Sequence, residues 1–194
     1  MPGYKITVGN CEIISLTDCT MQFPWSMFFP NVPEADRESY RDLYPACYGE
    51  VGFKTDAGAY AVRSSDKTVL VDTGIGPGPI AMLGGLEGHL IDDMKAKGVQ
   101  PESVDIVVHT HLHIDHVGWN LTGGKPTFPN ATYYAPEGDL AYFEANLATN
   151  PQMQQVLPLR EMGKLKTYSG ETAITPDLTT VPTPGHTPGH SSVL

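Results

Sequence analysis

The chain has 194 residues, of which 12 are basic and 22 acidic, so its formal net charge is −10. This length suits one well-buried domain and is too short for two of ordinary size. No cluster of Lys and Arg stands out, which disfavours nucleic acid and anionic membranes as partners. The three cysteines lack paired spacing, so neither a disulfide framework nor a zinc ribbon is predicted.

The N-terminus has no apolar run of the length that a signal peptide needs. No stretch reaches the roughly 18 to 20 apolar residues that span a bilayer. We therefore expect a soluble, cytoplasmic protein. An export signal removed before Met1 is the open alternative.

In the first half, Gly9-Asn10 separates two short apolar runs and predicts a hairpin. Residues 21–45 are aromatic without a period of 2 or 3.6, which indicates a long loop that contains a short helix. Long ordered loops in compact domains often carry function. The strands expected in this half are Tyr4–Val8, Glu12–Leu16, Val51–Lys54, Ala59–Arg63 and Thr68–Asp72.

In the second half, a helix is expected from Leu86 to Lys97, with Gly98 as its C-terminal glycine. The continuous apolar run Val104–His109 suits a strand buried on both faces. The remaining elements expected are a strand at Thr132–Ala135, helices at Pro136–Ala148 and Gln152–Leu157, and a hairpin formed by Ile174 and Leu178–Val181. Strands followed by strands mixed with helices predict a layered α/β domain.

Four imidazoles and one carboxylate fall within eight residues at the end of the buried strand: His109, His111, His113, Asp115 and His116. Zn²⁺ prefers imidazole nitrogen, with carboxylate oxygen as a harder companion. The spacing of His111 and His113 lets both rings converge, while Asp115 and His116 can face a second point nearby. A surface loop rich in histidine by chance is disfavoured, because four of the seven histidines lie here. His109 is expected in the core or behind the site.

Each metal needs a third nitrogen ligand that leaves a position open for water. The segment Thr183–His190 offers two histidines in a turn fixed by proline and glycine. His186 directly follows the preceding strand and is therefore preferred as a ligand. His190 is expected to be a structural hydrogen-bonding residue.

Three motifs together resemble the metallo-β-lactamase superfamily. The segment His111–His116, preceded by Thr110 and followed by Val117-Gly118, is similar to the family's His-x-His-x-Asp-His signature. Val71–Gly74 and Thr183–His190 match its other markers in the right order. The resemblance implies a single domain over 1–194 with an αββα sandwich, mainly its N-terminal half and the start of the second. The metals would lie at one edge of the two sheets.

The resemblance also implies a ligand set. By analogy His111, His113 and His186 form one site, and Asp115 and His116 contribute to a second. Asp72 would stand close behind the metals and orient a ligand imidazole through a hydrogen bond; a turn-forming aspartate is the competing interpretation. Two divalent metal ions are implied, with zinc favoured and manganese, iron and cobalt also compatible.

One departure from the family concerns the C-terminus. The family continues with a βα half that supplies a bridging aspartate and a last histidine ligand. This chain stops at Leu194, with no Asp or Glu after His186. It is therefore expected to be incomplete, with a second metal site that lacks these ligands.

The resemblance implies a hydrolase that uses a metal-activated hydroxide, with Asp115 in proton transfer. The run Asp115–Asn120, with the doubled Thr-Pro-Gly-His, is similar to the lactonase and organophosphate-hydrolase branch. An ester or lactone is therefore the expected substrate. Hydrolysis of a β-lactam, thioester or organophosphate on the same site is the alternative. An iron-dependent oxidoreductase and a non-catalytic metal-binding domain are rivals of other classes.

The aromatic segment Phe23–Phe29, within the loop 21–45, has two interpretations. It could cover the active-site entrance and line it for an acyl chain or aryl group. Packing over the sandwich edge or at a dimer contact explains it equally well, and a homodimer is left open.

Overall fold

A computed structural model describes residues 4–194, apart from the side chain of Met82. Its largest element is a seven-stranded sheet in the order β1-β2-β3-β4-β5-β8-β9. The strands β1 to β4 pair antiparallel, and β4, β5, β8 and β9 pair parallel. The strands of this sheet are β1 Lys5–Val8, β2 Cys11–Phe23, β3 Phe53–Ser64, β4 Lys67–Val71, β5 Ile106–Val108, β8 Thr132–Pro136 and β9 Leu165–Tyr168.

A second, antiparallel sheet consists of β10 Thr172–Thr175, β11 Leu178–Pro182 and β12 Ser191–Val193. The pairing of β10 with β11 is the expected hairpin. A short ribbon of β6 Leu121–Thr122 and β7 Lys125–Pro126 follows the histidine-rich segment.

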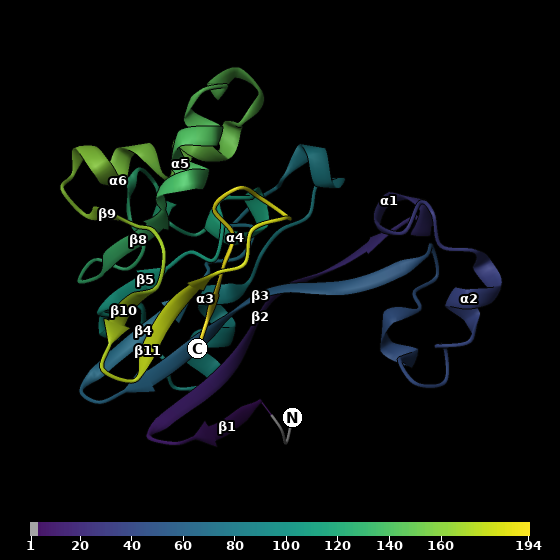
Figure 1. Cartoon of the computed structure of the whole chain (residues 1–194), viewed down its shortest axis with the longest axis horizontal. Helices are drawn as coiled ribbons and strands as arrows, with labels where there is room; N and C mark the ends of the chain where they lie inside the picture. Colours follow the sequence, from purple (N-terminus) through teal and green to yellow (C-terminus); the bar gives the residue numbers. More distant parts are fainter. Residues whose placement is uncertain (1–3) are drawn as a thin grey trace.

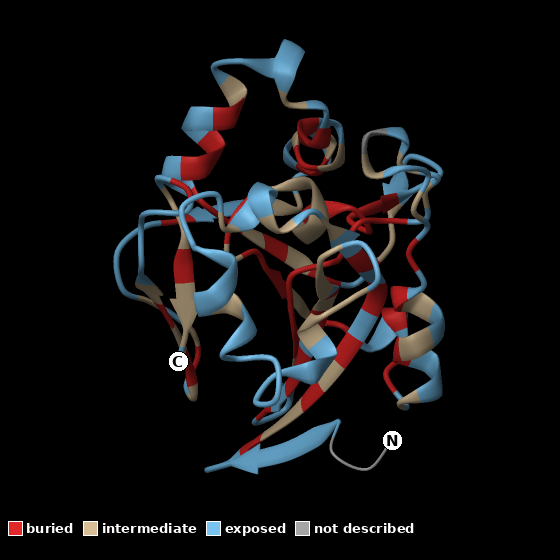
Figure 2. Cartoon of the chain, turned by 90° about the vertical axis from the view of Figure 1, so that its right-hand side faces the viewer, coloured by how far each residue is buried: buried red, intermediate tan, exposed pale blue. Residues whose placement is uncertain are grey.

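The large sheet buries apolar side chains on both faces because residues alternate along each strand. On β4, Leu70 joins a core with Leu90 and Met94 of a helix, whereas Val69 joins a second core. The second core includes Leu178 of β11, so it lies between the two sheets. Figure 2 shows the resulting bands of buried and exposed residues along the long strands. The layers are therefore helix, large sheet and small sheet, which confirms the predicted mixed α/β class.

The helices are short. They are α1 Trp25–Phe28, α2 Glu34–Glu38, α3 Leu90–Ala96, α4 Ile114–Val117, α5 Glu137–Glu144 and α6 Leu157–Glu161, with 3-10 turns at Pro45–Cys47, Ala81–Leu83, Pro101–Ser103, Leu147–Thr149 and Pro151–Gln155. The helix α3 begins later than predicted because the backbone of Leu86 pairs with Ile80 instead. Gly98 follows this helix with φ +76°, as its predicted role requires. Among the described residues no helix is long and apolar enough to cross a membrane.

The N-terminal part differs most from the expectation. The strand β2 runs on to Phe23, and the two strands predicted at Val51–Lys54 and Ala59–Arg63 are one continuous strand, β3. These two strands form a long arm that leaves the body of the molecule and ends in α1 and α2 (Figure 1). Residues 21–45 thus form the end of a strand and two short helices rather than a loop with one helix.

Candidate metal centre

The parallel strands β4 and β5 end side by side at one edge of the large sheet, where the site lies. Asp72 follows β4 with φ +62°, and its backbone N–H donates to Val108 O over 2.9 Å. The chain after β5 then forms the histidine-rich turn and α4. A third segment, the yellow loop between β11 and β12, reaches the same place (Figure 1). Ser191 N–H donates to Thr110 O at 3.0 Å and joins this loop to the turn.

Three imidazoles meet at this edge. One ring nitrogen from each of His111, His113 and His186 lies within 4.8 Å of the other two. Nδ1 of His113 and Nε2 of His186 are 3.0 Å apart. Nε2 of His111 is buried and has no hydrogen-bond partner among the described residues. Three ring nitrogens lie close to one another, and one of them is buried without a hydrogen-bond partner. A cation bound between them would satisfy all three.

The lowered pKa values of His111 and His113 agree with metal binding. Burial lowers the pKa of His111 to about 3, and burial with the nearby charge of His186 lowers the pKa of His113. Neutral imidazole is the form that ligates a metal, because a protonated ring nitrogen has no free lone pair. The residues present therefore fit a divalent ion of the zinc type.

Asp72 lies behind this cluster. Its carboxylate accepts hydrogen bonds from Thr110 N–H at 2.8 Å and from the Thr110 hydroxyl at 2.7 Å, and lies 2.8 Å from Nδ1 of His116. Burial opposes its ionisation, but the charge and hydrogen bond of His116 outweigh burial and hold the pKa of Asp72 below its ordinary value. This contact fixes the ring of His116 and leaves its Nε2 free for another group.

The Nε2 atom of His116 lies 3.4 Å from Oδ2 of Asp115, which is half-buried. Burial disfavours the charged ring of His116, yet the carboxylates of Asp72 and Asp115 raise its pKa to about 10. Burial would raise the pKa of Asp115, but its contact with His116 lowers it to about 2. In the absence of metal the three side chains form one ionised network. The rings of His116 and His111 are tilted at 49° to each other with 3.8 Å between centroids, so this network adjoins the three-histidine cluster.

The two other histidines near the site lie where the sequence analysis expects them. His109 is fully buried, with its Nδ1 3.9 Å from Asp72, so it lies behind the cluster. His190 points its Nδ1 at Thr183, 2.9 Å from the hydroxyl and 3.1 Å from the carbonyl oxygen. Its ring therefore has a structural partner within its own loop.

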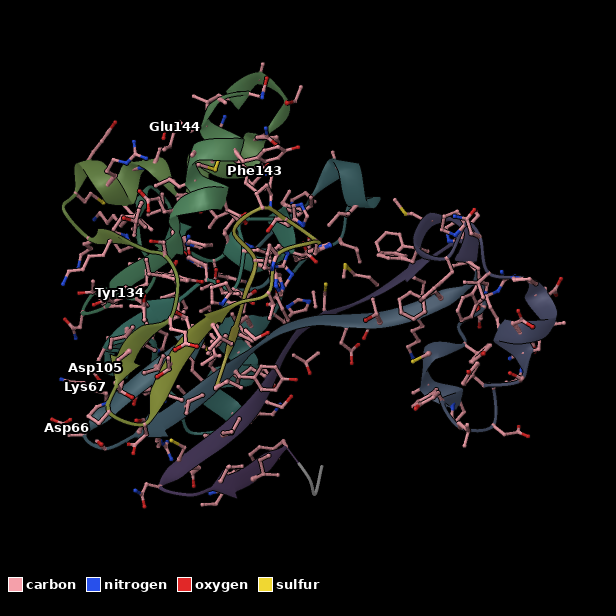
Figure 3. All side chains as sticks on the ribbon, in the orientation of Figure 1. Asp66, Lys67, Asp105, Tyr134, Phe143 and Glu144 are labelled. Atoms are coloured by element: carbon pink, nitrogen blue, oxygen red, sulfur yellow. The ribbon has the colours of Figure 1, made fainter. Side chains whose placement is uncertain are left out.

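One cavity borders the three-histidine cluster, and a second borders the neighbouring network of Asp72, Asp115 and His116. The first, of about 550 Å³, is lined by His113 and His186 together with Tyr142 and Phe143 of α5. Phe143, labelled in Figure 3, packs edge-on against His113 with 5.5 Å between ring centroids. The other cavity, of about 370 Å³, is lined by Asp72, Asp115 and His116 and by β3. A small molecule could thus reach the three-histidine cluster through the first cavity and the side chains of Asp115 and His116 through the second.

Two buried carboxylates were not singled out by the sequence analysis. Asp18 and Asp139 are 2% and 0% exposed, and each accepts three hydrogen bonds from segments far away in the chain. Asp139 contacts both histidine-bearing loops. The sequence offers no signal for this role, since an acidic residue in the first turn of a helix is ordinary.

A cluster of three histidines at the edge of a helix-backed mixed sheet fits a metal site in an α/β protein. Residues 57–194 match the model of the Metallo-beta-lactamase superfamily, and the chain belongs to this superfamily.

Two relatives illustrate the similarity in sequence. An N-acyl homoserine lactonase of Bacillus sp is 25% identical over 151 residues, covering 70% of this chain and 56% of the relative. The N-acyl homoserine lactonase AttM of Rhizobium radiobacter is 33% identical over 116 residues, covering 54% of this chain and 40% of the relative. The chain thus spans about half the length of these relatives.

Solved structures show the same architecture. The hydrolase AbOPH of the beta lactamase superfamily aligns with a TM-score of 0.82 and 29% identity, covering 98% of this chain and 68% of that protein. AidC, described as a dizinc quorum-quenching lactonase, aligns with a TM-score of 0.76 and 20% identity, covering 97% of this chain and 68% of that protein. At 20% identity the second likeness concerns the fold alone.

Proposed function

We propose that this protein is a metal-dependent hydrolase that opens a lactone ring, with N-acyl homoserine lactones as the substrate class. The observation that carries the proposal is the convergence of His111, His113 and His186 within 4.8 Å. The substrate class is supported by the relatives, which are N-acyl homoserine lactonases.

In this proposal His111, His113 and His186 hold one divalent ion, and Asp115 and His116 contribute to a second. Zinc is the favoured ion because the donors are mainly imidazole nitrogens. Bound ions would polarise the lactone carbonyl and lower the pKa of a water molecule, which supplies the nucleophile. In this proposal the ionised Asp115 accepts the proton from that water and passes it to the alkoxide oxygen that leaves when the ring opens.

The remaining side chains act by orientation and by shaping the cavity. Asp72 keeps the ring of His116 fixed through the contact at its Nδ1 atom. The cavity beside His113 and His186 has a mixed lining: Tyr142 and Phe143 offer a surface for an acyl chain, and Asn146 and Asn150 offer polar groups. Its volume of about 550 Å³ lies within the range of small-ligand sites.

The direct experiment measures ring opening of N-hexanoyl homoserine lactone by the metal-free protein and by protein supplied with Zn²⁺ or Co²⁺. Ring opening releases a proton near neutral pH, so a pH indicator follows the reaction. We expect hydrolysis only in the presence of metal. Protein that binds Zn²⁺ or Co²⁺ but opens no lactone would overturn the proposal. Oxygen consumption by protein supplied with iron would then favour an oxidoreductase.

The matched pair of variants is His186→Ala and His190→Ala. Both histidines lie in the same exposed loop, but only His186 belongs to the three-ring cluster. We expect His186→Ala to lose bound metal and hydrolysis together, whereas His190→Ala should retain metal. Equal loss of metal in the two variants would refute this choice of ligand.

A further inference from the structure

Asp139 joins the two loops that carry the three clustered histidines. Its Oδ2 atom accepts a hydrogen bond of 2.9 Å from the backbone N–H of Leu112, which lies between His111 and His113. The same oxygen accepts one of 2.9 Å from the hydroxyl of Thr187, the residue that follows His186. The other oxygen, Oδ1, accepts one of 2.6 Å from the N–H of Gly189. One carboxylate thus contacts a neighbour of every histidine in the cluster.

The packing around Asp139 supports a built contact. Asp139 has no exposed surface and lies in the first turn of α5. The last residue of this helix, Glu144, accepts two hydrogen bonds from Arg160 of α6. A Cβ added to Gly189 would lie 2.5 Å from the backbone nitrogen of Asp139, so the loop approaches the helix as closely as glycine allows. A buried carboxylate requires such donors, because leaving it without them is costly.

The hydrogen bonds of Asp139 bear on the distance between the His111–His113 turn and the His186 loop. His113 and His186 come from segments more than seventy residues apart, and yet their ring nitrogens lie 3.0 Å from each other. Thr187 and Leu112, which are sequence neighbours of these histidines, both donate to the same oxygen of Asp139. A change at this carboxylate would therefore act on the separation of the histidines rather than on either loop alone.

We propose that Asp139 is a positioning residue for the metal: it holds the His111–His113 turn and the His186 loop at the separation that lets all three rings bind one ion. The inference rests on the proposed function, since it assigns Asp139 a role at the same site. Asp139 does not touch the metal in this account. It acts through the backbone of Leu112 and Gly189 and the hydroxyl of Thr187.

The test compares Co²⁺ affinity, followed through the visible absorption of the bound ion, in the wild-type protein and in Asp139→Asn. The amide matches the carboxylate in size but can accept at only one of its two ends, so at least one donor loses its acceptor. Groups that orient metal ligands typically change metal affinity 10- to 100-fold when altered, and we expect a loss of about this size. Thr187→Val removes a single donor and should weaken binding by less.

Asp18→Asn is the matched control. Asp18 is also buried and accepts three hydrogen bonds, from Ile75 N–H at 2.5 Å, Leu90 N–H at 2.8 Å and Trp119 Nε1–H at 2.9 Å. None of these donors belongs to the loops that carry the clustered histidines. This variant should lower the melting temperature much as Asp139→Asn does, while its Co²⁺ affinity stays near that of the wild type.

The outcomes separate the inference from the proposed function. Weaker Co²⁺ binding in Asp139→Asn than in Asp18→Asn, at similar melting temperatures, supports the positioning role. If the wild-type protein binds Co²⁺ and Asp139→Asn binds it with the same affinity, this inference alone is overturned. An equal loss of Co²⁺ affinity in Asp139→Asn and Asp18→Asn overturns it as well. A wild-type protein that binds no Co²⁺ overturns the proposed function and the inference with it.

Discussion

His109 offers a test of how the buried side of the site responds to pH. Its side chain is fully buried, and both ring nitrogens lack hydrogen-bond partners among the described residues. Burial lowers its pKa from an ordinary value of 6.5 to about 4, although Asp72 nearby opposes the shift. The ring is therefore neutral in the folded protein at neutral pH.

The sign of the effect follows from which state binds the proton. Between pH 6.5 and 4 the unfolded chain protonates His109 and the folded chain does not, so protons favour unfolding. The stability from this group is complete above pH 6.5 and falls as the pH drops toward 4. A shift of this size corresponds to about 3 kcal/mol, since one pKa unit is about 1.4 kcal/mol.

The variant His109→Leu removes the titrating ring and keeps its apolar contacts. At pH 7 we expect the free energy of unfolding to change by about 1 kcal/mol or less, because no hydrogen bond of the ring is lost. Between pH 6.5 and 4 the wild-type protein should lose about 3 kcal/mol more than the variant. His109→Gln, which does not titrate either, should show the same flattening.

The assay is urea denaturation of the metal-free protein, kept so by a chelator, at a series of pH values from 7 to 4. Subtracting the variant from the wild type removes the contributions of the titrating groups that do not interact with His109. Parallel stability curves for the wild-type protein and both variants would refute the reasoning, because His109 would then be protonated equally in the folded and unfolded states.

Two further predictions concern stability and are read by thermal denaturation. Gly118→Ala should destabilise the protein severely or prevent folding, because the added Cβ would collide with backbone atoms of Ile75 and Gly76. The control is Gly98→Ala, whose Cβ meets no atom within 4 Å but whose φ is +76°, and it should cost only about 1–2 kcal/mol of stability. Equal loss of stability in the two variants would contradict this prediction. Phe128→Ala leaves a cavity at a fully buried position. It should lower the free energy of unfolding by about 3–5 kcal/mol, which corresponds to a fall in Tm of roughly 6–20 °C. A fall below roughly 2 °C would contradict this prediction and show that the core collapses around the cavity.

The sequence was most informative where chemistry is dense over a short span. Four histidines and an aspartate within eight residues predict a metal site, and the structure brings His111 and His113 together with His186 from a distant loop. The position of His186 was predictable because proline and glycine on both sides fix its turn. The buried β5 could be predicted from its unbroken apolar run.

Features that depend on distant partners were missed. The sequence pattern predicts two strands, Val51–Lys54 and Ala59–Arg63, where the structure has the single strand β3. Gly58, between them, lies where β2 bulges between Thr17 and Cys19, and a Cβ at this position would meet the backbone of Leu16. Asp139 resembles any acid at a helix start until its partners, about thirty and fifty residues away, are placed in space. Such contacts leave no local periodicity for a sequence pattern to reveal.

The most direct test of the account is anomalous diffraction from crystals of the protein soaked in Zn²⁺, with data collected on both sides of the zinc absorption edge. The account predicts an anomalous peak bound by Nε2 of His111, Nδ1 of His113 and Nε2 of His186. It would be contradicted by a map with no peak at this cluster, or by a peak bound by His190 in place of His186.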